Sequence, residues 1–63
     1  MRLFGKEVKL KNYNDEDPKI YFGTDTGKII NIHFHKEKLF YLVELETKEV
    51  IMVLPSHCEF INN

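Results

Sequence analysis

Apolar and polar residues alternate with a period of two along the middle of the chain. The alternation runs through three segments, Lys28–His35, Leu39–Glu46 and Glu49–Leu54, and this period puts successive side chains on opposite faces of a β-strand. The connections between the segments are too short for a crossover helix, so neighbouring strands must be antiparallel. The pattern therefore predicts a three-stranded meander at the centre of the fold.

A strand is also expected near each end of the chain. Within Phe4–Lys11, Val8 and Leu10 alternate with charged residues, as they do in a half-buried strand. Near the other end, Pro55 and Ser56 favour a single 3-10 turn that leads into a closing strand. We expect no α-helix, because alanine is absent and β-branched and aromatic residues dominate the apolar positions.

The first strand is followed by a polar stretch, Asn12–Pro18, whose Asn, Asp and Pro residues favour a solvent-facing loop. The carboxylates of this loop are predicted to receive an Arg or Lys side chain from a partner protein. These carboxylates belong to Asp15, Glu16 and Asp17. The aromatic floor expected beside them comprises Tyr13, Tyr21 and Phe40.

The alternation divides the apolar side chains of the central strands into two sets. The set assigned to the core comprises Ile30, Ile32, Phe34, Leu39, Tyr41, Val43, Leu45, Val50, Met52 and Leu54. The opposite set should be polar on the outside of a barrel, yet it contains Ile29, Phe40, Leu42, Ile51 and Val53. Such a patch on a small protein predicts an association surface, unless Leu3–Phe4 or Ile61 covers it.

Size and charge narrow the choice of function. Residues 1–63 form one small domain, near the lower limit for a single hydrophobic core. Nine basic and ten acidic side chains give a net charge of −1, whereas nucleic-acid binders usually carry a basic excess. One cysteine excludes an internal disulfide and favours a reducing, cytoplasmic setting. We expect no membrane segment, because the chain has no apolar run of spanning length.

Two short segments resemble those of a known superfamily. Leu54-Pro55-Ser56-His57-Cys58 is similar to the apolar-Pro-Ser segment that leads into the last strand of Src-homology-3-like barrels. Leu10–Asp15 resembles the tyrosine-containing segment that opens their long acidic loop. The resemblance implies a small five-stranded antiparallel barrel with one 3-10 turn before the last strand. Leu39-Phe40-Tyr41 stands where members that bind proline-rich peptides carry tryptophan, which argues against that ligand.

Two catalytic motifs are matched only in part. Asp25-Thr26-Gly27 is the triplet of the aspartic proteases, but no glycine follows Gly27 to complete their characteristic loop. Gly23–Lys28 resembles a phosphate loop, yet the spacing of its glycines is wrong and a strand follows in place of a helix. We therefore interpret both segments as turns.

The histidines suggest an alternative site for zinc. His33 and His35 lie two residues apart on one predicted strand, so their rings share a face. His57 and Cys58 would be further ligands if the last turn came close. The interpretation that we favour is an exposed histidine pair beside Lys36 and no bound metal or cofactor.

The sequence thus predicts a non-enzymatic binding or adaptor module that docks another protein and can pair with itself. A short chain rich in lysine, isoleucine and asparagine fits an accessory protein of a mobile element. The alternative is a nucleic-acid-binding barrel that uses Lys28, Lys36, Lys38 and the flanking aromatic residues.

Overall fold

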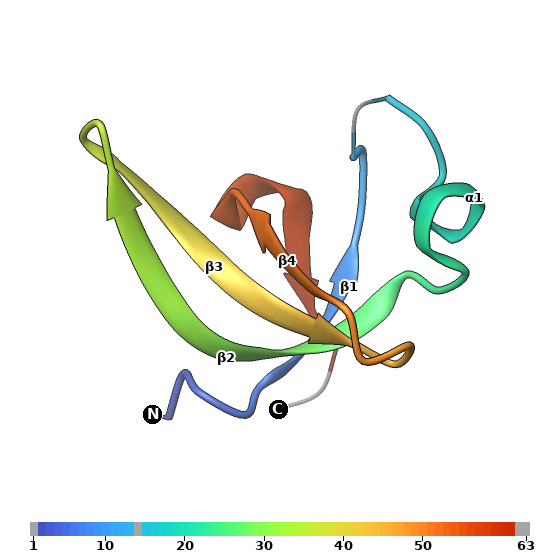
Figure 1. Ribbon diagram of the computed structural model, residues 1–63, viewed down its shortest axis with the longest axis horizontal. Helices are drawn as coiled ribbons and strands as arrows, with labels where there is room; N and C mark the ends of the chain where they lie inside the picture. Colours follow the sequence, from blue (N-terminus) through green and yellow to red (C-terminus); the bar gives the residue numbers. More distant parts are fainter. Residues whose placement is uncertain (1, 14, 62–63) are drawn as a thin grey trace.

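The computed structural model describes residues 2–13 and 15–61, and its main element is one antiparallel sheet of five strands. Figure 1 shows that the sheet is strongly bent and that its longest hairpin curves away from the rest. The elements are β1 (Glu7–Leu10), α1 (Pro18–Phe22), β2 (Thr26–His35), β3 (Lys38–Leu45), β4 (Val50–Val53), the 3-10 turn η1 (Pro55–His57) and β5 (Cys58–Phe60). The strand order is β4-β3-β2-β1-β5, with β4 and β5 at the edges, and the sheet is not closed. The all-β prediction is confirmed.

The central meander is also confirmed. β2 pairs with β3 as far as His35 opposite Lys38, and β3 pairs in turn with β4. The turn between β2 and β3 consists of Lys36 and Glu37, whose φ angles are 50° and 66°. Two positive φ angles are typical of a type I′ turn, whose twist matches that of the flanking strands. The hairpin therefore stays regular up to its tip.

The predicted 3-10 turn is confirmed at Pro55–His57, but the expectation that the chain has no α-helix is wrong. The short helix α1 begins after Asp17, whose side chain accepts a hydrogen bond from Lys19 N at 3.0 Å. Pro18 occupies the first turn, and Gly23 ends the helix with a φ of 78°. Capping at both ends compensates for weak helix-forming residues. Asn14, in the predicted loop, lies outside the described residues.

The core consists of six buried apolar side chains, and two of them were expected on the outside. The six are Val8, Leu10, Ile29, Val43, Leu45 and Val53. Ile29 and Val53 are wrongly assigned by the alternation, because β2 contains a bulge between Ile29 and Asn31 and β4 pairs Val53 opposite Tyr41. A bulge inserts one residue and changes the phase of the strand. Ile51 packs against the core, so its assignment to the outer face is wrong for the same reason as that of Val53.

Several side chains that the alternation assigned to the core are exposed instead. Val43 and Leu45 are buried as expected. The five large exposed ones are Ile30 (43%), Ile32 (42%), Phe34 (69%), Val50 (51%) and Met52 (44%). Ile32 and Phe34 do share the core side of the sheet, since they pair with Tyr41 and Leu39. They are exposed because the hairpin extends beyond the core there (Figure 1).

A buried hydroxyl joins the segment after α1 to the turn after β3. Thr24 is 8% exposed, and its Oγ1 donates a hydrogen bond of 2.8 Å to Glu46 Oε1. Thr24 Oγ1 also accepts a hydrogen bond of 3.2 Å from Thr26 N. Hydrogen bonds from Thr24 and Thr26 lower the pKa of Glu46. This network ties two loops that are far apart in the sequence to the start of β2.

Candidate protein-docking surface

An apolar patch covers part of the outer face of β2, β3 and β4, which is the face opposite the core. Leu42 lies at its centre, with Met52 opposite it on β4 and the bulge of β2 on its other side. Directly opposed side chains of neighbouring strands touch. We call this surface the outer patch, and it comprises Ile30, Phe40, Leu42, Val50 and Met52.

The outer patch differs in membership from the one predicted. Phe40 and Leu42 belong to it and are half-buried, whereas Ile29, Ile51 and Val53 point into the core. Ile30, Val50 and Met52 take their places, and sequence reasoning missed all three. The only signal for them was the run of consecutive apolar residues at Ile29–Ile30 and Val50–Leu54, which leaves the phase of a strand undetermined.

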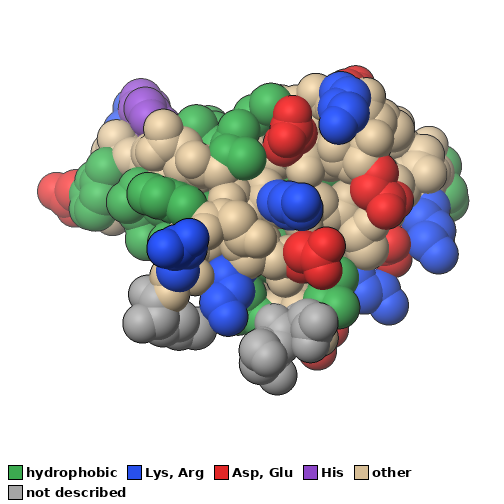
Figure 2. Space-filling view, turned by 90° about the horizontal axis from the view of Figure 1, so that it is seen from below, with side chains coloured by type: hydrophobic (Ala, Val, Ile, Leu, Met, Phe, Trp, Pro, Cys, Tyr) green, Lys and Arg blue, Asp and Glu red, His purple; other side chains and the backbone are tan. Residues whose placement is uncertain are grey.

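The outer patch stays open to solvent. Ile30, Val50 and Met52 are each 43 to 51% exposed. Leu3 packs against the core, Phe4 is 48% exposed and Ile61 lines a groove beside Glu7. The segments that the alternative named therefore leave the large side chains of the patch open to solvent. Figure 2 shows hydrophobic side chains gathered on the left half, with a histidine at the edge. An exposed surface of this kind is typical of an interaction site.

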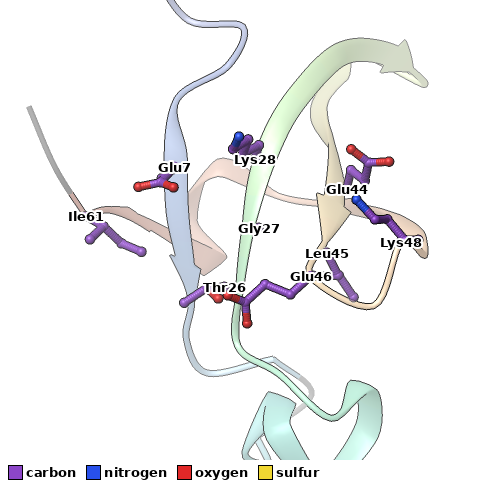
Figure 3. Close-up of a pocket in the computed structure, with 9 residues that line it drawn as sticks. All are labelled: Glu7, Thr26, Gly27, Lys28, Glu44, Leu45, Glu46, Lys48 and Ile61. Carbon is purple, nitrogen blue, oxygen red and sulfur yellow. The ribbon is translucent and has the colours of Figure 1, made fainter.

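A second part of the outer face, beside the outer patch, is charged. Glu7, Lys28 and Glu44 follow one another across β1, β2 and β3, at a shallow groove of about 440 Å³ whose other side is lined by Lys48. Figure 3 shows Glu7 and Ile61 on one side of β2, and Glu44 and Lys48 on the other. The alternating signs on the right half of Figure 2 agree with this arrangement. Lys28 lies between two carboxylates. It therefore does not form one continuous basic surface with Lys36 and Lys38 at the tip of the β2–β3 hairpin.

The acidic loop meets an aromatic cluster, though not the predicted one. The ring of Tyr13 lies 6.2 Å from Tyr21, 5.3 Å from Phe22 and 6.3 Å from His57. Phe40 is on β3 in the outer patch and is not part of this cluster. The floor is therefore completed by Phe22 and His57, which contribute from α1 and η1.

Two of the three carboxylates in the loop are engaged within the chain. Asp17 caps α1, and Glu16 Oε2 accepts a hydrogen bond of 3.2 Å from Tyr21 Oη. The negative charge of Glu16 raises the pKa of the Tyr21 hydroxyl. Asp15 is exposed. These bonds give Glu16 and Asp17 a structural role, which weakens the prediction that the loop grips a basic side chain of a partner.

The histidine and cysteine residues are not brought together as zinc ligands. The rings of His33 and His35 stack with centroids 5.9 Å apart, while His57 packs against Tyr13. Burial raises the pKa of the Cys58 thiol to about 11. Across residues 2–13 and 15–61, no group of three or more His, Cys, Asp or Glu side chains is placed to hold a metal ion.

Comparison with known proteins found no matching family model, no matching curated protein and no matching solved structure. In the described part of the chain, no helix combines the length and the apolar character needed to cross a membrane.

Proposed function

We propose that this chain is a small, non-enzymatic protein-binding module that docks another protein chain on its outer patch. The observation that carries the proposal is the exposure of three large apolar side chains around Leu42, namely Ile30, Val50 and Met52. Burying apolar surface stabilises a complex by about 25 cal/mol per Å² before the costs of association. The charged part of the outer face would form the polar rim that such an interface needs.

We also propose that the architecture is that of a Src-homology-3-like barrel left open on one side. The strand order β4-β3-β2-β1-β5 supports this assignment. So does the position of η1 directly before β5. On β2, the pairing with β1 covers the beginning of the strand, whereas the pairing with β3 continues to the hairpin tip. A long strand shared between two pairings in this way bends the sheet towards a barrel.

Photo-crosslinking in the cells that naturally produce the protein tests the docking surface. A photoreactive amino acid replaces Met52 in one variant and Lys48, in the charged groove, in a matched control. We expect a discrete adduct with another protein from position 52 and none from position 48. The same adduct should disappear when Leu42→Glu is added, provided that circular dichroism shows the variant to be folded. Absence of an adduct at position 52, or equal adducts from both positions, would refute the docking surface.

One observation favours nucleic-acid binding as a second candidate function. Phe34 is 69% exposed near the hairpin tip, between His33 and His35 and close in sequence to Lys36 and Lys38. Exposed aromatic rings beside basic groups are typical of single-strand binding. Fluorescence anisotropy with a labelled single-stranded oligonucleotide should then show binding that weakens steeply with salt, and Phe34→Ala should abolish it. A flat titration at low salt would eliminate this candidate.

A further inference from the structure

The strand β2 has a partner on both sides only along its first part. Thr26, Gly27 and Lys28 pair with β1, and Ile29 exchanges backbone hydrogen bonds with Lys6 and Gly5. Beyond the bulge, Asn31–His35 pairs with β3, and within the described residues no strand pairs with its other side. The far half of β2 is therefore an open edge inside the strand order, distinct from the edges at β4 and β5.

The turn geometry shows which backbone groups face this open edge. In a two-residue hairpin the two residues that close the turn, here His35 and Lys38, exchange two backbone hydrogen bonds. Along the ladder from there, hydrogen-bonded and non-hydrogen-bonded pairs alternate. His33 then points its backbone groups towards β3, whereas Ile32 and Phe34 point theirs outwards. The position of Ile32 agrees, because its N–H donates to its neighbour Asn31 at Oδ1, 2.8 Å away, and not to β3.

The residues of this edge are not those that usually block strand pairing. Asn31–His35 contains no proline, lysine or acidic residue, and these are the residues that natural proteins place on edges to prevent association. The other two edges are shorter: β4 has four residues and β5 has three, and Pro55 follows closely after β4. The open edge of β2 is thus the most competent of the three for pairing.

We propose that a second copy of this chain pairs with the open edge, antiparallel, about a two-fold axis at His33. This register brings Ile32 opposite Phe34 of the partner subunit, and the symmetric pair repeats the contact. The outward backbone groups are then in phase and form four hydrogen bonds. A two-fold contact closes on itself and stops at a dimer.

Side chains and charge also suit this register. Ile32 and Phe34 share the core side of the sheet, so each apolar side chain finds an apolar cross-strand neighbour. The net charge of −1 leaves little repulsion between two copies. The bond from Ile32 N–H to Asn31 Oδ1 is replaced by a bond to the backbone carbonyl of Phe34 of the partner subunit. This pairing goes beyond the docking proposal, because it uses the edge of β2 and leaves the outer patch free.

Analytical ultracentrifugation of the full chain tests the proposal with three variants. Ile32→Pro removes the outward N–H without touching the β3 ladder, and proline is tolerated at such an edge position. We expect wild type to dimerise, Ile32→Pro to dimerise roughly 10- to 100-fold more weakly, and Ile32→Val, which keeps the N–H, to behave like wild type. Leu42→Glu should leave the dimer intact.

The outcomes separate the edge from the outer patch. A dimer that Leu42→Glu dissolves and Ile32→Pro does not would overturn the edge pairing in favour of self-association through the patch. A wild type that stays monomeric at millimolar concentration would also overturn it, and would leave the docking proposal standing. If Ile32→Pro fails to fold, amide hydrogen exchange measured on the wild-type protein at several concentrations tests the edge pairing instead. The Ile32 and Phe34 amides should gain protection as concentration rises, and unchanged exchange would refute the pairing.

Discussion

The two halves of β2 have opposite surroundings although they belong to one continuous strand. Ile29, before the bulge, is completely buried, whereas Phe34, near the tip, is 69% exposed. The first half lies between β1 and β3, and in the described part of the chain the second half is paired with β3 alone. The difference indicates that stability is concentrated before the bulge and that the second half, with its β3 partner, is available for contacts with other molecules.

Such a division is expected for a chain of this size. A small domain has a total stability of only a few kcal/mol, about 0.05–0.15 kcal/mol per residue. Apolar side chains placed beyond the core contribute less to that total, since part of their surface stays in water in the folded state. Their presence at the β2–β3 tip agrees with the binding roles that we propose.

The largest effect should come from truncating the buried half. Ile29→Ala removes part of a fully buried side chain and should cost about 2–5 kcal/mol of unfolding free energy, enough to unfold most of the protein. Ile32→Ala, three residues further on, should cost about 0.5–1 kcal/mol, because the side chain is 42% exposed. Urea denaturation followed by circular dichroism measures both. Equal losses would show that the two halves do not differ in packing.

A smaller but specific effect is expected at Gly27, where β2 approaches β3 closely. A Cβ atom added there would lie 2.7 Å from both Glu44 O and Val43 Cγ1, which is too close for real Cβ contacts. Gly27→Ala should therefore destabilise the fold by about 1–3 kcal/mol, measured by thermal unfolding. A variant as stable as wild type would show that the strands can separate without cost.

The smallest effect concerns the buried hydroxyl of Thr24 and depends on pH. Because hydrogen bonds lower the pKa of Glu46 in the folded state, they contribute stability above the ordinary glutamate pKa, and this contribution is lost as pH falls through the lowered value. Thr24→Val should therefore destabilise the protein more at about pH 7 than at about pH 3. Thermal unfolding at both pH values measures the difference.

A matched control for this substitution is Thr47→Val. Thr47 Oγ1 donates to Glu49 Oε1 over 3.0 Å in an exposed turn, so its removal should change the unfolding temperature little at either pH. A pH-independent loss for Thr24→Val would mean that the variant acts through packing alone and not through the carboxylate of Glu46.

Sequence reasoning located the strands better than it assigned their faces. Short connections with turn residues were enough to predict the meander, and Pro55 and Ser56 were enough to predict η1. The phase of β2 was wrong before the bulge because Ile29 and Ile30 are equally apolar, and only the pairing with β3 shows that the extra residue lies between Ile29 and Asn31. Helix α1 was missed because its caps, Asp17 and Gly23, were interpreted as parts of turns.

For the candidate site, the sequence predicted an apolar surface on the outer face but not all of the residues that form it. An apolar surface on the outer face of β3 was expected, and Phe40 and Leu42 do lie there. The run Val50–Leu54, which contains β4, is five consecutive apolar residues and gives no alternation from which a face can be chosen, so Val50 and Met52 were assigned to the wrong side. The acidic loop was expected to bind outside groups, yet it engages Tyr21 and the N-terminus of α1, contacts that depend on tertiary structure.

The extra residue at Ile30 has a consequence for how this chain can change over generations. Substitutions before it alter the volume of a filled interior and are restricted to a few side chains. Substitutions after it act mainly on what the molecule presents to its surroundings, because Ile32 and Phe34 are 42% and 69% exposed. New specificities can therefore accumulate on the far half of β2 while the scaffold that supports it is inherited unchanged.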